Sequence, residues 1–368
     1  MIFGRRKNDS GDSAAAVEEA ETPELIEARR LVDAGEHFAA IDLLNEANRR
    51  SRSTATEIEI RRIRNLAGMH LLEDPPPDPR HPDPASPPPV NPETKLPEVT
   101  PAELTPELLR GAMLSSGALL VRGLMDRGKA ERMATEIDHS FDVRKRVQAG
   151  VPDPDGYYDE LEPEPPFIIG ERSWIEEGGG VLAVDSPRLL FEMLESFEAA
   201  GLRSVIADYL GERPAISGQK CTLRKATPDV AGAWHQDGAF MGDVRALNVW
   251  LSLSRCGDVA PSMDVVPRRL DDFVATGTEG TYLDFQVSQA VAEEAAGDVG
   301  IVRPIFDPGD ALLFDDVFLH QTGSDPSMPN PRYAIELVLR SVRLPGQLRA
   351  DRLLGAVLRR PHPPGKRI

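Results

Sequence analysis

Two histidines and one aspartate in this chain have the residue types and the order of a metal site. His235 and Asp237 are two residues apart, and His320 follows much later in the sequence. Residues i and i+2 of a strand point to the same side, so His235 and Asp237 can present an imidazole and a carboxylate to one ion. His320 can complete the set from another strand. Two histidines and one carboxylate hold non-haem Fe(II) on one face and leave the opposite face open.

A fourth residue, Arg332, lies twelve residues after His320, on the strand expected to follow it. A guanidinium can bind a carboxylate through two parallel hydrogen bonds. Arg332 is therefore suited to the far carboxylate of a dicarboxylic co-substrate. A lone H-x-D sequence is common, and a lone arginine at the start of a strand is often a surface residue. The four residues in this order, within strand-like surroundings, favour an iron site.

These residues and their surroundings resemble the phytanoyl-CoA dioxygenase family of Fe(II)/2-oxoglutarate-dependent oxygenases. The resemblance covers roughly residues 104–344. Besides the ligands, it is carried by S-G-A-L-L-V-R-G-L at 116–124, N-V-W-L-S-L at 248–253 and G-D-A-L-L-F at 309–314. One departure is the sequence Pro267-Arg268-Arg269, which stands where the family usually has a Pro-Gly-Ser-His turn.

The resemblance implies a double-stranded β-helix with catalytic Fe(II) ligands His235, Asp237 and His320, and with Arg332 as the 2-oxoglutarate anchor. The family's commonest reaction is hydroxylation. It uses O2 and 2-oxoglutarate, releases succinate and CO2, and here implies attack on an unactivated C–H bond of a small organic substrate. Related halogenases lack the carboxylate ligand, so Asp237 implies oxygen transfer.

Further site residues are implied less directly. Gln219, Thr222 and Asn248 are candidates to hydrogen-bond the 2-oxoglutarate carboxylates, because family members use polar residues of the equivalent strands. Trp234 and Trp250 are candidates to line the substrate pocket, and core packing explains both equally well. Tyr333 and Glu336 are interpreted as residues of the fold.

Two other functions remain open. One is a jelly-roll metalloprotein of another reaction class, such as a cupin-type enzyme without 2-oxoglutarate, which would give Arg332 no role. The other is a non-catalytic scaffold, which would release no succinate.

Composition limits the class of protein. The 368 residues are 40% hydrophobic and 28% charged, as in a soluble globular protein. The sequence contains no run of about 18 apolar residues, so it predicts no membrane span. The first residues lack the apolar core of a secretory signal, and two cysteines give no disulfide framework, so a cytoplasmic location is expected. The net charge of −18 argues against nucleic-acid binding and gives no reason to expect a polyanionic substrate.

Composition also divides the chain into sections. We expect a disordered N-terminus (1–21), a tetratricopeptide-like helical segment (22–72), a proline-rich linker (73–100), the oxygenase domain (101–346) and a basic tail (347–368). A single tetratricopeptide-like hairpin cannot bury its own face, since arrays need about three repeats. Residues 22–72 are therefore predicted to pack on the main domain or to mediate self-association or another protein contact.

The sequence pattern of the main domain predicts an α+β fold. The sequence predicts helices starting at Thr105-Pro106, from Asp126 to about Phe141 and over 186–210, and strands over 118–122, 216–224 and 247–253. Short strands at regular spacing favour a jelly roll with flanking helices. The irregular segment 150–180 is interpreted as a lid or binding loop. The pattern leaves open which face of strand 247–253 points inward.

Overall fold

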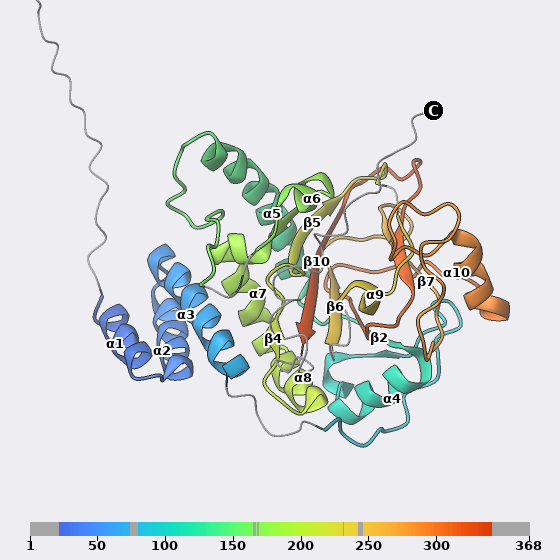
Figure 1. The fold of residues 1–368 in the computed structure, drawn as a ribbon, viewed down its shortest axis with the longest axis horizontal. Coiled ribbons are helices and arrows are strands. Elements are labelled where there is room, and N and C mark those ends of the chain that lie inside the picture. The colour runs from blue at the N-terminus through green and yellow to red at the C-terminus, as the bar shows by residue number, and fades with distance from the viewer. Residues whose placement is uncertain are drawn as a thin grey trace, which may run out of the picture.

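The fold is given by a computed structural model, which describes residues 22–73, 80–164, 167, 169–230, 232–241 and 246–340. The predicted disordered N-terminus and basic tail lie outside these residues. Within them, a large sheet and a small sheet are surrounded by helices (Figure 1). The expectation of an α+β fold is confirmed. No helix in the described part of the chain is long and apolar enough to cross a bilayer.

The large sheet has eight strands in the order β1-β2-β8-β6-β10-β5-β3, with β4 paired to β10. Only β1 and β2 are parallel; the other pairs are antiparallel. The bounds are β1 Glu98–Val99, β2 Ala118–Val121, β3 Gly180–Leu182, β4 Ala215–Ile216, β5 Thr222–Ala226, β6 Ala246–Ser252, β8 Ala311–Phe314 and β10 Arg332–Arg340.

The two faces of this sheet have different partners. Leu247, Val249 and Leu251 of β6 point toward a large apolar core formed with the helices. Those helices are α4 Pro106–Ser116, α5 Arg127–Gln148, α7 Pro187–Ala199 and α8 Leu202–Leu210. The opposite face carries Asn248 and Trp250. A second core joins that face to the small sheet of β7 (Ser262–Val265) and β9 (His320–Gly323). The structure thus shows which residues of strand 247–253 lie on each face, a question that the sequence left open. The double-stranded β-helix stays a prediction.

Helix starts follow the predicted caps. Thr105 Oγ1 accepts the Leu108 amide at 3.2 Å, and Asp126 Oδ1 accepts the Lys129 amide at 3.0 Å. Helix α5 extends past the predicted end near Phe141, because Val143 on the next turn is also buried. The single helix predicted over 186–210 is divided into α7 and α8. Gly201 adopts a left-handed φ of 69° between them, which ends the first helix.

The strand predicted over 216–224 is also interrupted. Ser217 accepts a hydrogen bond from the Lys220 amide at 3.0 Å, so the chain turns before β5 begins at Thr222. The remaining short elements are α6 Ser173–Glu177, α9 Gly238–Met241, α10 Gln289–Ala296 and the 3-10 turns Pro101–Glu103, Ala183–Asp185 and Gly297–Val299.

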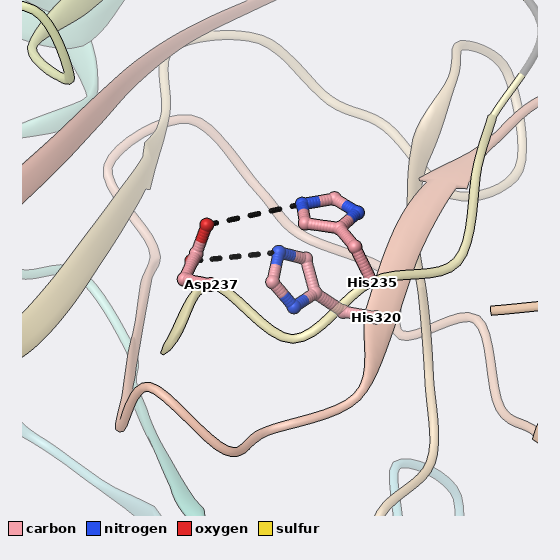
Figure 2. A group of neighbouring side chains, drawn as sticks. All are labelled: His235, Asp237 and His320. Carbon is pink, nitrogen blue, oxygen red and sulfur yellow. Dashed lines mark ion pairs between the residues drawn. The ribbon is translucent and has the colours of Figure 1, made fainter. Parts of the chain in front are cut away.

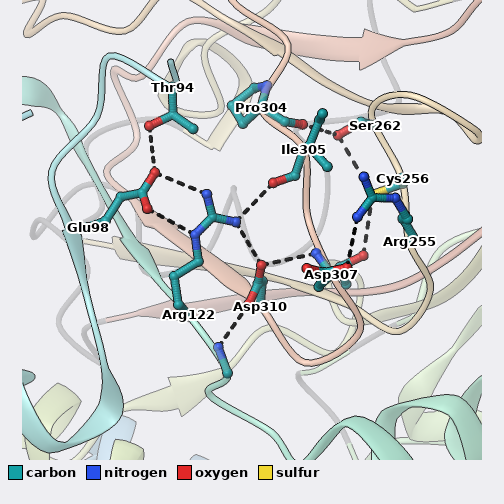
Figure 3. Close-up of polar contacts among 12 residues, drawn as sticks. Thr94, Glu98, Arg122, Arg255, Cys256, Ser262, Pro304, Ile305, Asp307 and Asp310 are labelled. Atoms are coloured by element: carbon teal, nitrogen blue, oxygen red, sulfur yellow. Dashed lines mark hydrogen bonds and ion pairs between the residues drawn. The ribbon is translucent and has the colours of Figure 1, made fainter. Parts of the chain in front are cut away.

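A partly buried ionic group joins the edge of the large sheet to the loop before β8 (Figure 3). Arg122 donates to both oxygens of Glu98 at 3.0 Å, to Asp310 at 2.7 Å and to the Ile305 carbonyl at 2.9 Å. Asp310 also accepts the Gly123 amide at 2.8 Å. Asp310, which stands in the G-D-A-L-L-F motif, therefore aligns strands β1, β2 and β8.

The N-terminal helices α1 (Pro23–Asp33), α2 (His37–Arg50) and α3 (Thr54–Glu73) form their own apolar cluster at one end of the molecule (Figure 1). Phe191 of α7 packs against this cluster. The buried Arg61 of α3 donates to the Val184 carbonyl at 2.9 Å and pairs with Asp159 of the 150–180 segment. The helices therefore pack on the rest of the chain.

The described part of the proline-rich segment lies along the main domain. The Ala85 amide donates to the Glu107 carbonyl at 2.9 Å, and His81 Nδ1 lies 2.7 Å from the Tyr209 carbonyl. A Cβ added at Gly111 of α4 would lie 1.8 Å from the Ala85 oxygen, so only glycine permits this close approach. Residues 80–85 are thus held against the main domain by backbone contacts, although four of the six are exposed. The domain boundaries stay a prediction.

Candidate metal centre

His235, Asp237 and His320 are brought together at the small sheet (Figure 2). His235 and His320 face each other in an antiparallel bridge and exchange both backbone hydrogen bonds, at 2.9 and 3.1 Å. Their rings lie side by side, with centroids 4.4 Å apart. Asp237 faces both rings: its oxygens lie 3.9 Å from His235 Nε2 and 4.0 Å from His320 Nε2. Three residues far apart in sequence thus form one group.

The two imidazoles are oriented by backbone carbonyls. His235 Nδ1 lies 2.7 Å from the Ala233 oxygen, and His320 Nδ1 lies 2.9 Å from the Phe318 oxygen. An Nδ1–H that donates to a carbonyl leaves Nε2 with its lone pair free for a metal. Both Nε2 atoms point toward Asp237. The second hydrogen bond that metal-ligating histidines normally make is therefore already present.

The three donors surround one point but stand apart from one another. All the ligand atoms of the triad lie within 4.8 Å of one another. Donors about 2.1 Å from one ion and on the same face of it are about 3 Å apart, so the three side chains would have to draw together by about 1 Å to share an ion. Burial, followed by the neighbouring His320, lowers the pKa of His235, which keeps that ring neutral and able to coordinate. The donor set and its protonation thus fit a divalent transition metal.

Neighbouring residues fix the segment that carries the first two ligands. The buried Gln236 donates to the Val317 carbonyl at 2.6 Å and accepts the Val274 amide at 2.8 Å. A Cβ added at Gly238 would lie 2.6 Å from the Phe273 ring, so a larger residue after the aspartate would require that side chain to move. Gln236 was not identified from the sequence, where a polar residue beside two ligands gives no sign of burial.

Arg332 lies in the large sheet, at the start of β10, and is only 1% exposed. Its Nη2 donates to Glu336 at 3.2 Å and its Nη1 to the Ser262 carbonyl at 3.4 Å, while Trp250 lies 5.3 Å below the guanidinium. Its Nε has no hydrogen-bond partner among the described residues. The same atom is unpaired in five other arginines, so what distinguishes Arg332 is that its whole guanidinium is buried and keeps one N–H donor that an anion can accept from.

Glu336 is shared between two arginines. It accepts from Arg332 and, at 3.0 Å, from Arg224 Nη1. Burial raises the pKa of Glu336, but the two arginines outweigh it and hold the pKa below its usual range, so the carboxylate stays charged. The sequence interpretation of Glu336 as a residue of the fold missed this contact with the anchor candidate. Its spacing of four residues from Arg332, which puts both on one face of a strand, was the available signal.

Two other candidates share this face. Thr222 stands opposite Glu336 in the β5–β10 pairing, and Asn248 stands opposite Val338 in the β6–β10 pairing. The amide nitrogen of Asn248 is buried and has no partner among the described residues. The triad is linked to this face through Phe314, whose ring packs 4.7 Å from His320 and which pairs with Asn248 across β8 and β6.

Two candidates lie elsewhere. Trp234 precedes His235 in an extended segment, so its side chain points to the side opposite that of His235. Its indole packs near Val266 and Val287 and donates to Gln289 at 2.7 Å. The structure thus shows core packing for Trp234, which was one of the two interpretations of this residue. Gln219 lies in the turn before β5, beside Gly170, rather than on the strand. The Ser217-Gly218 turn is the reason.

Comparisons with known proteins give matches only among solved structures: no family model and no curated protein matches the chain. EctD from S. alaskensis with 2-oxoglutarate and 5-hydroxyectoine is 18% identical, with a TM-score of 0.44, over 73% of this chain and 85% of that one. EvdO2 from Micromonospora carbonacea var. aurantiaca, complexed with 2-oxoglutarate, is 17% identical, with a TM-score of 0.40, over 63% and 89%.

A third match is the epimerase SnoN in complex with Fe3+, alpha ketoglutarate and nogalamycin RO. It is 17% identical, with a TM-score of 0.40, over 64% of this chain and 83% of that one. At these identities and TM-scores the likeness carries no argument about reaction or substrate. Those conclusions have to rest on the side chains of this chain.

Proposed function

We propose that this chain is an Fe(II)- and 2-oxoglutarate-dependent dioxygenase similar to the phytanoyl-CoA dioxygenase family. It hydroxylates an unactivated C–H bond of a small organic substrate with release of succinate and CO2. The observation that carries the proposal is the convergence of two Nε2 atoms, each freed by a carbonyl at Nδ1, on the Asp237 carboxylate. When bound there, iron supplies the activation of O2 that side chains cannot provide.

The residues divide the remaining work. His235, Asp237 and His320 hold the metal on one side and leave the other side for exchangeable ligands. Arg332 binds the distal carboxylate of 2-oxoglutarate; its burial and its unpaired Nε support this role. Glu336 orients Arg332. Thr222 and the unpaired amide of Asn248 are the polar groups available to the co-substrate on the same face.

The test is turnover. Protein loaded with Fe(II) is incubated with 2-oxoglutarate, O2 and a metabolite extract, and succinate and new oxygenated products are measured together. We expect succinate formation that depends on iron and on the extract, and none from His320→Ala. Iron binding without any use of 2-oxoglutarate would favour another class of metalloenzyme. Absence of both would favour the non-catalytic scaffold.

A further inference from the structure

Lys220 is a cation beside the triad that the proposed function does not use. Its Nζ lies 4.0 Å from the centroid of Phe240 and 5.4 Å from that of Trp174. Among the described residues, no carboxylate forms an ion pair with this ammonium and no acceptor takes a hydrogen bond from it. Cation–π contacts are weaker than a hydrogen-bonded ion pair and leave the three N–H donors of the ammonium available.

The charged groups around Lys220 leave an excess of positive charge. Burial lowers the pKa of Lys220, Asp237 and Glu336 act in the opposite direction, and Arg224 adds to the lowering. Glu336 is already shared by Arg224 and Arg332, and Asp237 belongs to the metal set. With Arg332 counted through its pairing with Glu336, three cations share two carboxylates. A divalent metal and dianionic 2-oxoglutarate would cancel each other, so one positive charge would remain. The chain is strongly acidic as a whole, which makes this local excess of positive charge a specific feature of the site.

The aromatic neighbours give the second part of the inference. Phe240 belongs to α9, directly after the ligand segment, and packs 5.1 Å from Phe285. Trp174 belongs to α6 in the 150–180 segment and is 47% exposed. Trp174 is exposed and contacts Lys220, which lies next to the metal triad. Together the two side chains form a surface suited to a ligand with an apolar part and a charged end. The segment interpreted as a binding loop therefore reaches the site through Trp174.

We propose that Lys220 binds an anionic group of the substrate, a carboxylate or a phosphate, while Phe240 and Trp174 contact the apolar part next to it. The proposal rests on the proposed function, since it concerns the substrate of the same site. It assigns Lys220 to substrate positioning and specificity, and it narrows the substrate class to organic anions.

The test compares two probes that differ only in charge, phenylacetate and phenylacetamide. Binding is followed by the relaxation of the probe protons in NMR, with Mn(II) and 2-oxoglutarate bound to the full chain. We expect the wild type to bind phenylacetate at least about tenfold more tightly than the amide. Lys220→Met should abolish this preference and Lys220→Arg should retain it. Lys145→Met, which removes an exposed lysine of α5, is the matched control and should behave as wild type.

The outcomes separate this inference from the proposed function. No preference in the wild type, or a preference that survives in Lys220→Met, overturns the inference. The affinity for 2-oxoglutarate alone is measured in the same samples and should change by less than about threefold in Lys220→Met. A loss of about a hundredfold would show that Lys220 binds the co-substrate's own carboxylate, which also overturns it. A wild type that binds neither the metal nor 2-oxoglutarate contradicts the proposed function itself.

Discussion

The metal triad and the Arg332 face are assembled in different ways. The triad needs one antiparallel bridge and a short H-x-D segment, and its orienting contacts are carbonyls within two residues of each histidine. The Arg332 face needs the register of three strands, β5, β6 and β10, before Arg224, Asn248 and Glu336 come near one another. The metal triad can be recognised from the order and spacing of its residues along the chain. The Arg332 face depends on which strands pair in the fold.

The two regions also differ in charge. The triad has one carboxylate and two imidazoles whose Nε2 atoms face it, an arrangement that a metal ion would complete. Arg332 already has a counter-ion in Glu336, and its Nε has no partner in the part of the chain that the structure describes. Loss of a triad residue should therefore abolish binding of the metal, while loss of Arg332 should weaken binding of an anion and leave the metal in place.

The largest expected effect is that of His320→Ala. Removing one of three ligands should abolish Fe(II) binding at micromolar metal, measured by equilibrium dialysis. His139→Ala, which removes an exposed histidine of α5, is the control and should bind one iron per chain. If His320→Ala binds iron at full strength, the histidine does not belong to the site and the contrast between the two regions disappears.

The next effect is that of Arg332→Ala. Losing one partner of a buried charged pair costs about 3–5 kcal/mol. The 2-oxoglutarate requirement should therefore rise by at least about a hundredfold, at 1.4 kcal/mol per factor of ten, while iron binding changes little. Arg332→Lys should recover only part of the loss, because an ammonium lacks the planar fork. An unchanged 2-oxoglutarate midpoint would assign the anchor to Arg224 or Arg340 instead.

The same contrast explains what the sequence could predict. The order His235, Asp237, His320 and Arg332 identified the metal group and placed Arg332 on the strand after β9, because strand geometry and ligand chemistry constrain spacing. Other features depend on which strands pair. They are the inward face of β6, the turn that displaces Gln219 and the outward direction of Trp234. Lys220 was visible only as a charged residue, since Phe240 and Trp174 come from distant segments. Glu336 lies four residues from Arg332, but its second partner, Arg224, comes from another strand.

A third prediction uses a region remote from both sites. Arg61→Ala removes a buried guanidinium that holds the Val184 carbonyl and Asp159. Hydrogen bonds to charged groups contribute about 1.5–3 kcal/mol, so the free energy of unfolding in urea should fall by about 2 kcal/mol. Metal and 2-oxoglutarate affinities should not change. Arg62→Ala on the same helix breaks a more exposed pair with Glu59 and should cost under about 1 kcal/mol. Equal losses in the two variants would contradict the role of Arg61 in attaching the helices.

The smallest effect concerns the two tryptophans. Trp250→Leu removes the ring under Arg332, and a desolvated cation–π contact contributes about 1–2 kcal/mol. The 2-oxoglutarate affinity should therefore fall by about five- to thirtyfold. Trp234→Leu should lower thermal stability and leave that affinity unchanged, since its indole lies in the cluster with Val266 and Val287. A similar loss of affinity in both variants would mean that general loosening of the fold, and not the contact with Arg332, sets the affinity.

The most direct test of the central claim is an anaerobic titration of 2-oxoglutarate into the Fe(II)-loaded wild type. Chelation of the iron by the co-substrate gives a metal-to-ligand absorbance band. We expect this band to appear, to saturate at one 2-oxoglutarate per iron, and to be absent from His320→Ala. A protein that binds iron but shows no band at saturating 2-oxoglutarate would contradict the account, because the triad would then hold its metal for a different reaction.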